Sequence, residues 1–235
     1  MWNRMDLKMR AKQAFQRNYW SAVAVALVMA IITAIFYGSG NGARDRHSYY
    51  GGGGFFSEFS LMYATMVVVA GVIGVGMIVL DVFVGNVLMV GGYRFFVLNQ
   101  TEPVTAGTLV YGFKSGNYGN IVLVMFLRDL FTALWTLLFI VPGVIKHYEY
   151  LMVPYIIAEN PGMPREEAFL ISKKMMMGQK WEAFVLELSF VGWIILSVIT
   201  CGIVGVFYVE PYRQATFAEL YSYNRAVAYQ NGYIR

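Results

Sequence analysis

Long apolar stretches alternate with short basic ones along the chain. Residues 19–37 form an apolar run without a single charge, and residues 61–90 form a longer run whose only charged residue is Asp81. An α-helix rises about 1.5 Å per residue, so about 20 apolar residues cross the roughly 30 Å hydrocarbon core of a bilayer. Both runs are therefore predicted to be membrane-spanning helices.

Three further apolar runs follow at residues 121–141, 144–158 and 182–209. The Pro-Gly pair at 142–143 predicts a break between the first two, because proline lacks an amide donor and glycine accommodates tight turns. The last run is long enough for one tilted helix, or for a hairpin broken at 200–202. The pattern thus leaves five or six spans open.

The distribution of lysine and arginine decides between five and six spans. With six spans and both termini cytoplasmic, 14 of the 18 basic residues lie inside, Arg44, Arg46 and Lys146 lie outside, and Arg128 lies within the membrane. Cytoplasmic loops of membrane proteins carry this excess of positive charge, whereas five spans would put the C-terminal arginines on the wrong side. We therefore predict six spans.

Three stretches of similar character recur along the chain. Each combines basic and aromatic residues and precedes a pair of apolar runs; they are 7–20, 105–120 and 165–181. Each pair then closes on a related phrase: LMVGGY at Tyr93, LMVPY at Tyr155 and YVEPY at Tyr212. An internal repeat of surface helix and hairpin explains this order. Aromatic residues that recur at any membrane interface are the alternative explanation.

The predicted fold is therefore an all-α integral membrane protein. It has six transmembrane helices in three pseudo-repeated hairpin units, each preceded by a cytoplasmic amphipathic helix. The units cover about residues 1–100, 101–160 and 161–235, and together they form one polytopic membrane domain. Residues 38–60 belong to no unit, and their glycine content predicts a flexible extracytoplasmic loop.

Composition agrees with this class and excludes several others. Apolar residues make up 58% and charged residues 14%, against about 45–50% and 25% in soluble domains. One cysteine and two histidines exclude a disulfide framework and a multi-thiolate metal site, so no cofactor or metal is expected. The basic residues follow the membrane boundaries, which argues against nucleic-acid binding. Common nucleotide-binding and catalytic motifs are missing, which favours a protein that is not an enzyme.

Five ionisable residues fall at predicted membrane depth: Asp81, Arg128, Asp129, Glu149 and Glu187. Charges there cost a few kcal/mol or more each, so they are usually paired or functional. We expect Arg128 to pair with Asp81 or Glu149, and at least one remaining acid to be protonated or to face water. The cluster is either an ion pair that fixes helix register, or the lining of a polar cavity for a cation, a proton or a lipid headgroup.

Several segments resemble a known family. They are LWTLLFIVPGVIKHYEYLMVPYIIAENP (134–161), EEAFLISKKMMMGQKW (166–181), LSFVGWIILSVITCGIVG (188–205) and PYRQATFAELY (211–221). Together they resemble the bacterial integral membrane proteins of the domain of unknown function 975 family. The resemblance implies a multi-pass helical protein of the bacterial plasma membrane. It implies no activity and no catalytic residues.

Two functions are compatible with these features. The first is a non-enzymatic membrane module that acts through a protein partner, a second copy of itself or the organisation of membrane lipids. The second is a small transporter or lipid-handling protein that uses the charged cluster. A water-accessible cavity that reaches Asp129 or Glu187 would favour the second function, and a dry, fully paired cluster would favour the first.

Overall fold

The computed structural model describes residues 2–37 and 56–234, and within these ranges it is helical without a strand. This confirms the all-α prediction. Three helices in the described ranges are long and apolar enough to cross a bilayer: Tyr63–Leu98, Tyr118–Leu138 and Lys180–Ile199. A fourth joins them if the consecutive helices α1 and α2, bent by 105°, form one span. The chain thus has the apolar helices of a membrane protein.

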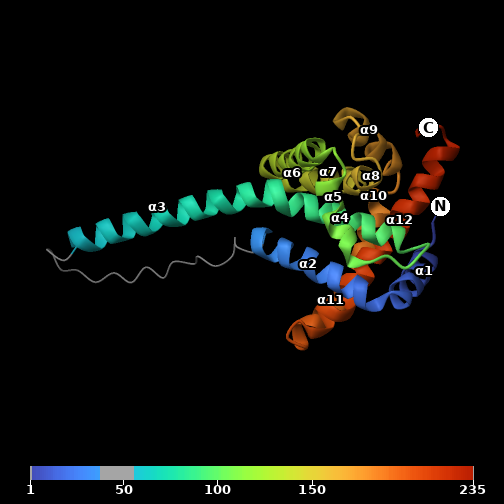
Figure 1. Cartoon of the computed structure of the whole chain (residues 1–235), viewed down its shortest axis with the longest axis horizontal. Helices are drawn as coiled ribbons and strands as arrows, with labels where there is room; N and C mark the ends of the chain where they lie inside the picture. Colours follow the sequence, from blue (N-terminus) through green and yellow to red (C-terminus); the bar gives the residue numbers. More distant parts are fainter. Residues whose placement is uncertain (1, 38–55, 235) are drawn as a thin grey trace.

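The N-terminal part contains the longest helical stretch. Helix α1 (Arg4–Arg17) is capped by the Asn3 side chain and is followed by α2 (Tyr19–Tyr37). After the region outside the described residues, α3 (Phe56–Leu80) continues through a π-helical turn, η2 (Asp81–Gly85), into α4 (Asn86–Leu98). The predicted loop 38–60 lies outside the described residues up to position 55, and its last part already belongs to α3. Helix α3 extends far beyond the rest of the molecule (Figure 1).

The middle part forms a tight helical hairpin. The short helices η3 (Ala106–Val110) and α5 (Tyr111–Lys114) lead into α6 (Tyr118–Leu138), which is followed by α7 (Ile140–Glu149) and α8 (Val153–Glu159). The chain reverses at Phe139, where the backbone is extended. A Cβ atom on Gly143 would lie 2.6 Å from the Thr136 Cα atom, so glycine is needed where α7 crosses α6.

This turn corrects the break predicted at 142–143. Pro142 lies in the first turn of α7 instead. Proline is tolerated there because the first amide groups of a helix have no intrahelical acceptor. The reversal therefore falls three residues earlier than the sequence indicated, in an unbroken apolar segment.

The C-terminal part contains a second hairpin. Helix α9 (Arg165–Met175) precedes α10 (Lys180–Leu188) and α11 (Val191–Ile199), and the chain returns through η4 (Gly205–Val209) into α12 (Glu210–Gln230). Cys201 and Gly202 have φ values of 51° and 86°, in the left-handed region that reverses a chain. The run 182–209 is therefore a hairpin broken at 200–202 and not one tilted helix.

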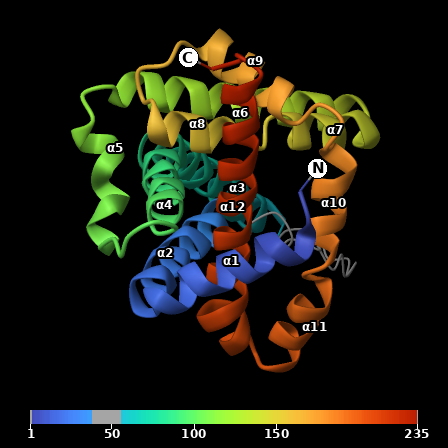
Figure 2. The same cartoon turned by 90° about the vertical axis from the view of Figure 1, so that its right-hand side faces the viewer.

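The buried core lies where the ends of these helices meet. Helix α1 packs across α12, and both chain termini lie at this same end of the molecule (Figures 1 and 2). Two asparagine side chains near the starts of helices form hydrogen bonds with later loops. Asn18 donates to the Val104 carbonyl at 2.7 Å, and Asn120 donates to the Pro161 and Met163 carbonyls at 2.7 and 2.8 Å. The opposite ends of the hairpins project away from this core.

Candidate functional site

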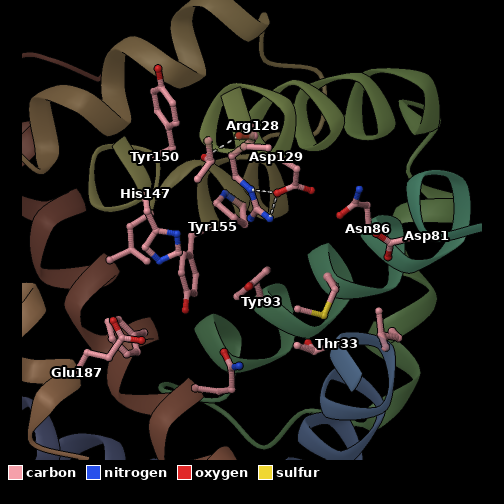
Figure 3. A pocket seen from close by; sticks show the side chains of 18 of the residues that line it. Thr33, Asp81, Asn86, Tyr93, Arg128, Asp129, His147, Tyr150, Tyr155 and Glu187 are labelled. Carbon is pink, nitrogen blue, oxygen red and sulfur yellow. Dashed lines mark hydrogen bonds and ion pairs between the residues drawn. The ribbon is translucent and has the colours of Figure 1, made fainter. Parts of the chain in front are cut away.

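A cavity of about 800 Å³ lies between the helical hairpins. Its walls come from α2, η2, α4, α6, α7, α8, α10 and α12, so the N-terminal, middle and C-terminal parts of the chain all contribute. Four of the five ionisable residues singled out by the sequence line it: Asp81, Arg128, Asp129 and Glu187 (Figure 3). The structure thus brings together side chains that are up to 106 positions apart in the chain (187 − 81 = 106).

Helix α6 supplies an ion pair to one wall of the cavity. The Arg128 Nε and Nη2 atoms donate to Asp129 Oδ1 at 2.9 and 2.5 Å. The Thr132 hydroxyl, one turn further along the helix, donates to the Arg128 carbonyl at 2.8 Å. Both charged side chains are about three-quarters buried, with exposed fractions of 21% and 28%. A guanidinium and a carboxylate are therefore presented together to the cavity.

A second ion pair lies across the cavity, between α10 and α12. Arg213 contacts Glu187 at 3.5 Å and Glu210 at 3.0 Å. The Tyr148 hydroxyl of α7 donates to the Glu187 carboxylate at 2.5 Å. Sequence analysis missed Arg213 as a site residue because it was counted among the cytoplasmic charges. Its position directly after the repeated proline-tyrosine phrase, and three residues after Glu210, was the available signal.

Asp81 reaches the cavity through the π-helical turn η2, which it begins. Its carboxylate lies over Gly85, where a Cβ atom would collide with it. Asn86, 3% exposed, follows directly and also lines the cavity. Single π-helical turns inside α-helices frequently occur at functional sites, because they redirect side chains. Sequence periodicity did not predict this turn.

Aromatic and apolar side chains complete the lining. Tyr93 and Tyr155, which close two of the repeated phrases, pack with ring centroids 4.7 Å apart. Figure 3 shows both rings and His147 around the same space as the Arg128–Asp129 pair. The remaining wall is largely apolar and includes Ile32, Met89, Leu137, Leu151 and Phe217. The cavity thus combines opposite charges with an apolar surface.

Glu149, the fifth predicted residue, does not line this cavity. Its carboxylate contacts the ammonium groups of Lys146, Lys173 and Lys180 at 3.1, 3.8 and 3.0 Å. The expectation that Glu149 serves as the partner of Arg128 is therefore wrong, because α7 turns this side chain toward α9 and α10.

The same contacts correct the predicted position of one lysine. The charge count put Lys146 on the opposite side of the membrane from Lys173 and Lys180, yet all three ammonium groups meet one carboxylate. The cause is the early chain reversal at Phe139, which places Lys146 about two helical turns into the returning helix.

Within the residues that the structure describes, no group of three or more histidine, cysteine, aspartate or glutamate side chains has a geometry that could hold a metal ion. Two acids of the cavity, Asp129 and Glu187, lie beside guanidinium groups.

Part of the chain matches the model of a known protein family. The family described as "Protein of unknown function (DUF975)" matches residues 140–227. These residues belong to the DUF975 family. The DUF975 region runs from the start of α7 into α12 and supplies His147, Glu187 and Arg213 to the cavity. Asp81, Arg128 and Asp129 lie before the matched region. Comparisons with curated proteins and with solved structures gave no match.

Proposed function

We propose that this protein is a bacterial plasma-membrane protein that binds a zwitterionic amphiphile in its central cavity, for transport or lipid handling. The observation that carries the proposal is the placement of two ion pairs from different hairpins around one cavity, Arg128–Asp129 and Arg213–Glu187. Of the two functions compatible with the sequence, a cavity that includes both Asp129 and Glu187 favours this one.

The chemistry of the lining supports the ligand class. Guanidinium groups bind phosphate and carboxylate through paired hydrogen bonds, and carboxylates bind ammonium groups. A molecule with both an anionic group and an amine can therefore bind either ion pair. Its anionic group would bind the arginine, and its amine would bind the carboxylate. Other apolar residues of the lining, such as Leu151 and Phe217, suit an attached hydrocarbon chain.

The charge arrangement favours binding over catalysis. Four ionisable groups of the cavity are engaged in the ion pairs Arg128–Asp129 and Arg213–Glu187, and Glu187 also accepts the Tyr148 hydroxyl. Groups that are held by opposite charges and hydrogen bonds are suited to recognising a ligand's charges. We therefore propose a non-enzymatic role.

The proposed membrane arrangement has six embedded helical stretches, two in each of three units, with both termini cytoplasmic. Its support is the element order: α1, the segment η3–α5, and α9 each precede two longer helical stretches. The common location of the two termini also agrees with it. Charged residues at the bilayer midplane often mark the path of a substrate, which is where this arrangement would put the cavity.

The test is lipid retention by the purified chain in nanodiscs of phosphatidylglycerol and phosphatidylethanolamine in equal parts. Native mass spectrometry would count the phosphatidylethanolamine that stays bound. Ala133 lines the cavity, whereas its neighbour Leu134 does not. We expect Ala133→Trp to reduce retained phosphatidylethanolamine several-fold, and Leu134→Trp to leave it unchanged.

Equal retention by both variants and the original protein would refute the cavity as the binding site. Copurification of a protein in fixed stoichiometry, without any such lipid difference, would favour a membrane module that acts through a protein partner.

A further inference from the structure

A second charged cluster lies outside the cavity, where α7 meets α9 and α10. The ammonium groups of Lys146, Lys173 and Lys180 converge on the Glu149 carboxylate, and each lies within 3.8 Å of one of its oxygens. The Ser172 hydroxyl donates to the Glu149 carbonyl at 2.7 Å, which fixes α9 against the end of α7. Three separate chain segments therefore hold these lysines together.

The charges of this cluster do not cancel. Three lysines surround one carboxylate, which leaves an excess of two positive charges. The Glu149 side chain is only 5% exposed, whereas those of Lys146, Lys173 and Lys180 are 24%, 55% and 30% exposed. Each ammonium has three donors. Lys146 and Lys180 each donate one hydrogen bond to Glu149, and Lys173 lies 3.8 Å from it, so donors remain on all three. A buried anion thus positions a surface group of cations that repel one another.

The surroundings of the cluster are those of a membrane interface. Lys180 is the first residue of the apolar helix Lys180–Ile199. Beside it, Trp181 is 70% exposed, and Met177 on the preceding turn is 67% exposed. Tryptophan is enriched at the headgroup level of bilayers, and lysines there attract anionic lipids. A negatively charged group that meets this cluster would thus lie next to exposed apolar side chains.

We propose that Lys146, Lys173 and Lys180 form a binding site for the phosphate of an anionic phospholipid. The phosphate oxygens accept hydrogen bonds from the three ammonium groups and neutralise their excess charge, while the acyl chains pass along Trp181 and α10. The site is separate from the central cavity and does not depend on the ligand proposed for it. Free phosphate shares the headgroup chemistry, but it would make no use of the apolar surface.

The chain contains a matched control for this site. Lys174 is the next residue of α9 after Lys173, yet its ammonium lies 4.9 Å from the centre of the Tyr233 ring and not at Glu149. Replacing either lysine by glutamine removes the same charge from the same helix. A general electrostatic attraction to the membrane would respond equally to both changes.

The experiment uses the full chain in phosphatidylcholine nanodiscs with added phosphatidylglycerol, and native mass spectrometry measures the phosphatidylglycerol retained. A lysine near an anionic membrane contributes about 1 kcal/mol, so Lys173→Gln and Lys180→Gln should each weaken retention about fivefold. Lys174→Gln should leave retention unchanged, and Lys173→Arg should restore it. Thermal unfolding and gel filtration of Lys173→Gln would establish that this variant is folded.

Two results would overturn the proposal. Equal losses in Lys173→Gln and Lys174→Gln would show a diffuse attraction without a defined site. Displacement of the phosphatidylglycerol by millimolar inorganic phosphate would identify free phosphate as the occupant. Ala133→Trp should leave phosphatidylglycerol retention unchanged, and this result separates the lysine site from the central cavity.

Discussion

Helices α11 and α12 follow one another in the chain, but they differ in how their residues are buried. Helix α11, VGWIILSVI, is almost entirely apolar, yet none of its residues is buried. Helix α12 carries many polar residues, yet most of its first twelve residues are buried, including Gln214, Thr216 and Glu219. A water-soluble protein would show the reverse. The comparison indicates that lipid surrounds α11 and that protein surrounds α12.

The same contrast separates the two ends of the molecule. The tip of the α6–α7 hairpin exposes Leu137, Phe139 and Ile140 at 85%, 67% and 75%. At the other end, Tyr221 of α12 is 2% exposed, stacks on Tyr155 and donates its hydroxyl to Glu159 at 2.6 Å. The hairpin tip thus has an apolar exposed surface, whereas the packed end contains buried side chains joined by polar contacts.

The largest expected effect comes from a charge on α11. Val191, 43% exposed, lies near the middle of the apolar helix Lys180–Ile199. Val191→Lys should cost about 2.5–3.5 kcal/mol of insertion free energy if lipid faces this position. The measurement is the membrane-inserted fraction of the protein, with Val191→Leu as the control. An unchanged fraction would mean that water, and not lipid, surrounds α11.

An intermediate effect is expected on the packed side of the comparison. Tyr221→Phe removes the hydrogen bond to the Glu159 carboxylate but keeps the ring stacked on Tyr155. We expect a loss of about 1.5 kcal/mol of unfolding free energy, because hydrogen bonds to charged groups contribute about this much. Thermal unfolding in detergent would measure it. Tyr229→Phe, at a position that is 52% exposed, is the control and should have little effect.

The smallest effect concerns pH. Burial raises the pKa of Glu219 in α12, and Arg10 of α1 only partly opposes this. The folded protein therefore holds this proton at pH values where the unfolded chain has lost it. Stability should fall as the pH rises from the ordinary glutamate pKa, about 4.3, through the raised value in the folded state. Glu219→Gln should remove this slope, a difference below about 1 kcal/mol. An identical pH dependence in both proteins would contradict the burial of this carboxylate.

The helical class and most helix positions could be predicted from the sequence, because long apolar runs have few alternatives to a membrane helix. The hairpin at 200–202 was one of two predicted forms, and the left-handed Cys201 and Gly202 explain it. The turn at Phe139 could not be predicted, since its neighbours are uniformly apolar and Pro142 fits inside the first turn of α7.

The candidate site was predictable only in part. Counting depth along each helix selected Asp81, Arg128, Asp129 and Glu187, which the fold brings to one cavity. Depth alone does not give the direction of a side chain, and for this reason Glu149 was assigned to the same group. Arg213 was missed for the converse reason, because its position suggested the membrane boundary while α12 directs it toward Glu187.

The central claim is that the Arg128–Asp129 pair faces an open cavity that water can enter, and neighbouring positions on α6 test it most directly. Ala133→Cys places a thiol in the cavity lining and Leu134→Cys places one on the outer face, each combined with Cys201→Ser to remove the native thiol. The measurement is the rate of modification by a small cationic methanethiosulfonate in membranes. We predict rapid modification at position 133 and slow modification at position 134. Equally slow modification at both positions would show a dry, packed cluster and would contradict the proposed binding cavity.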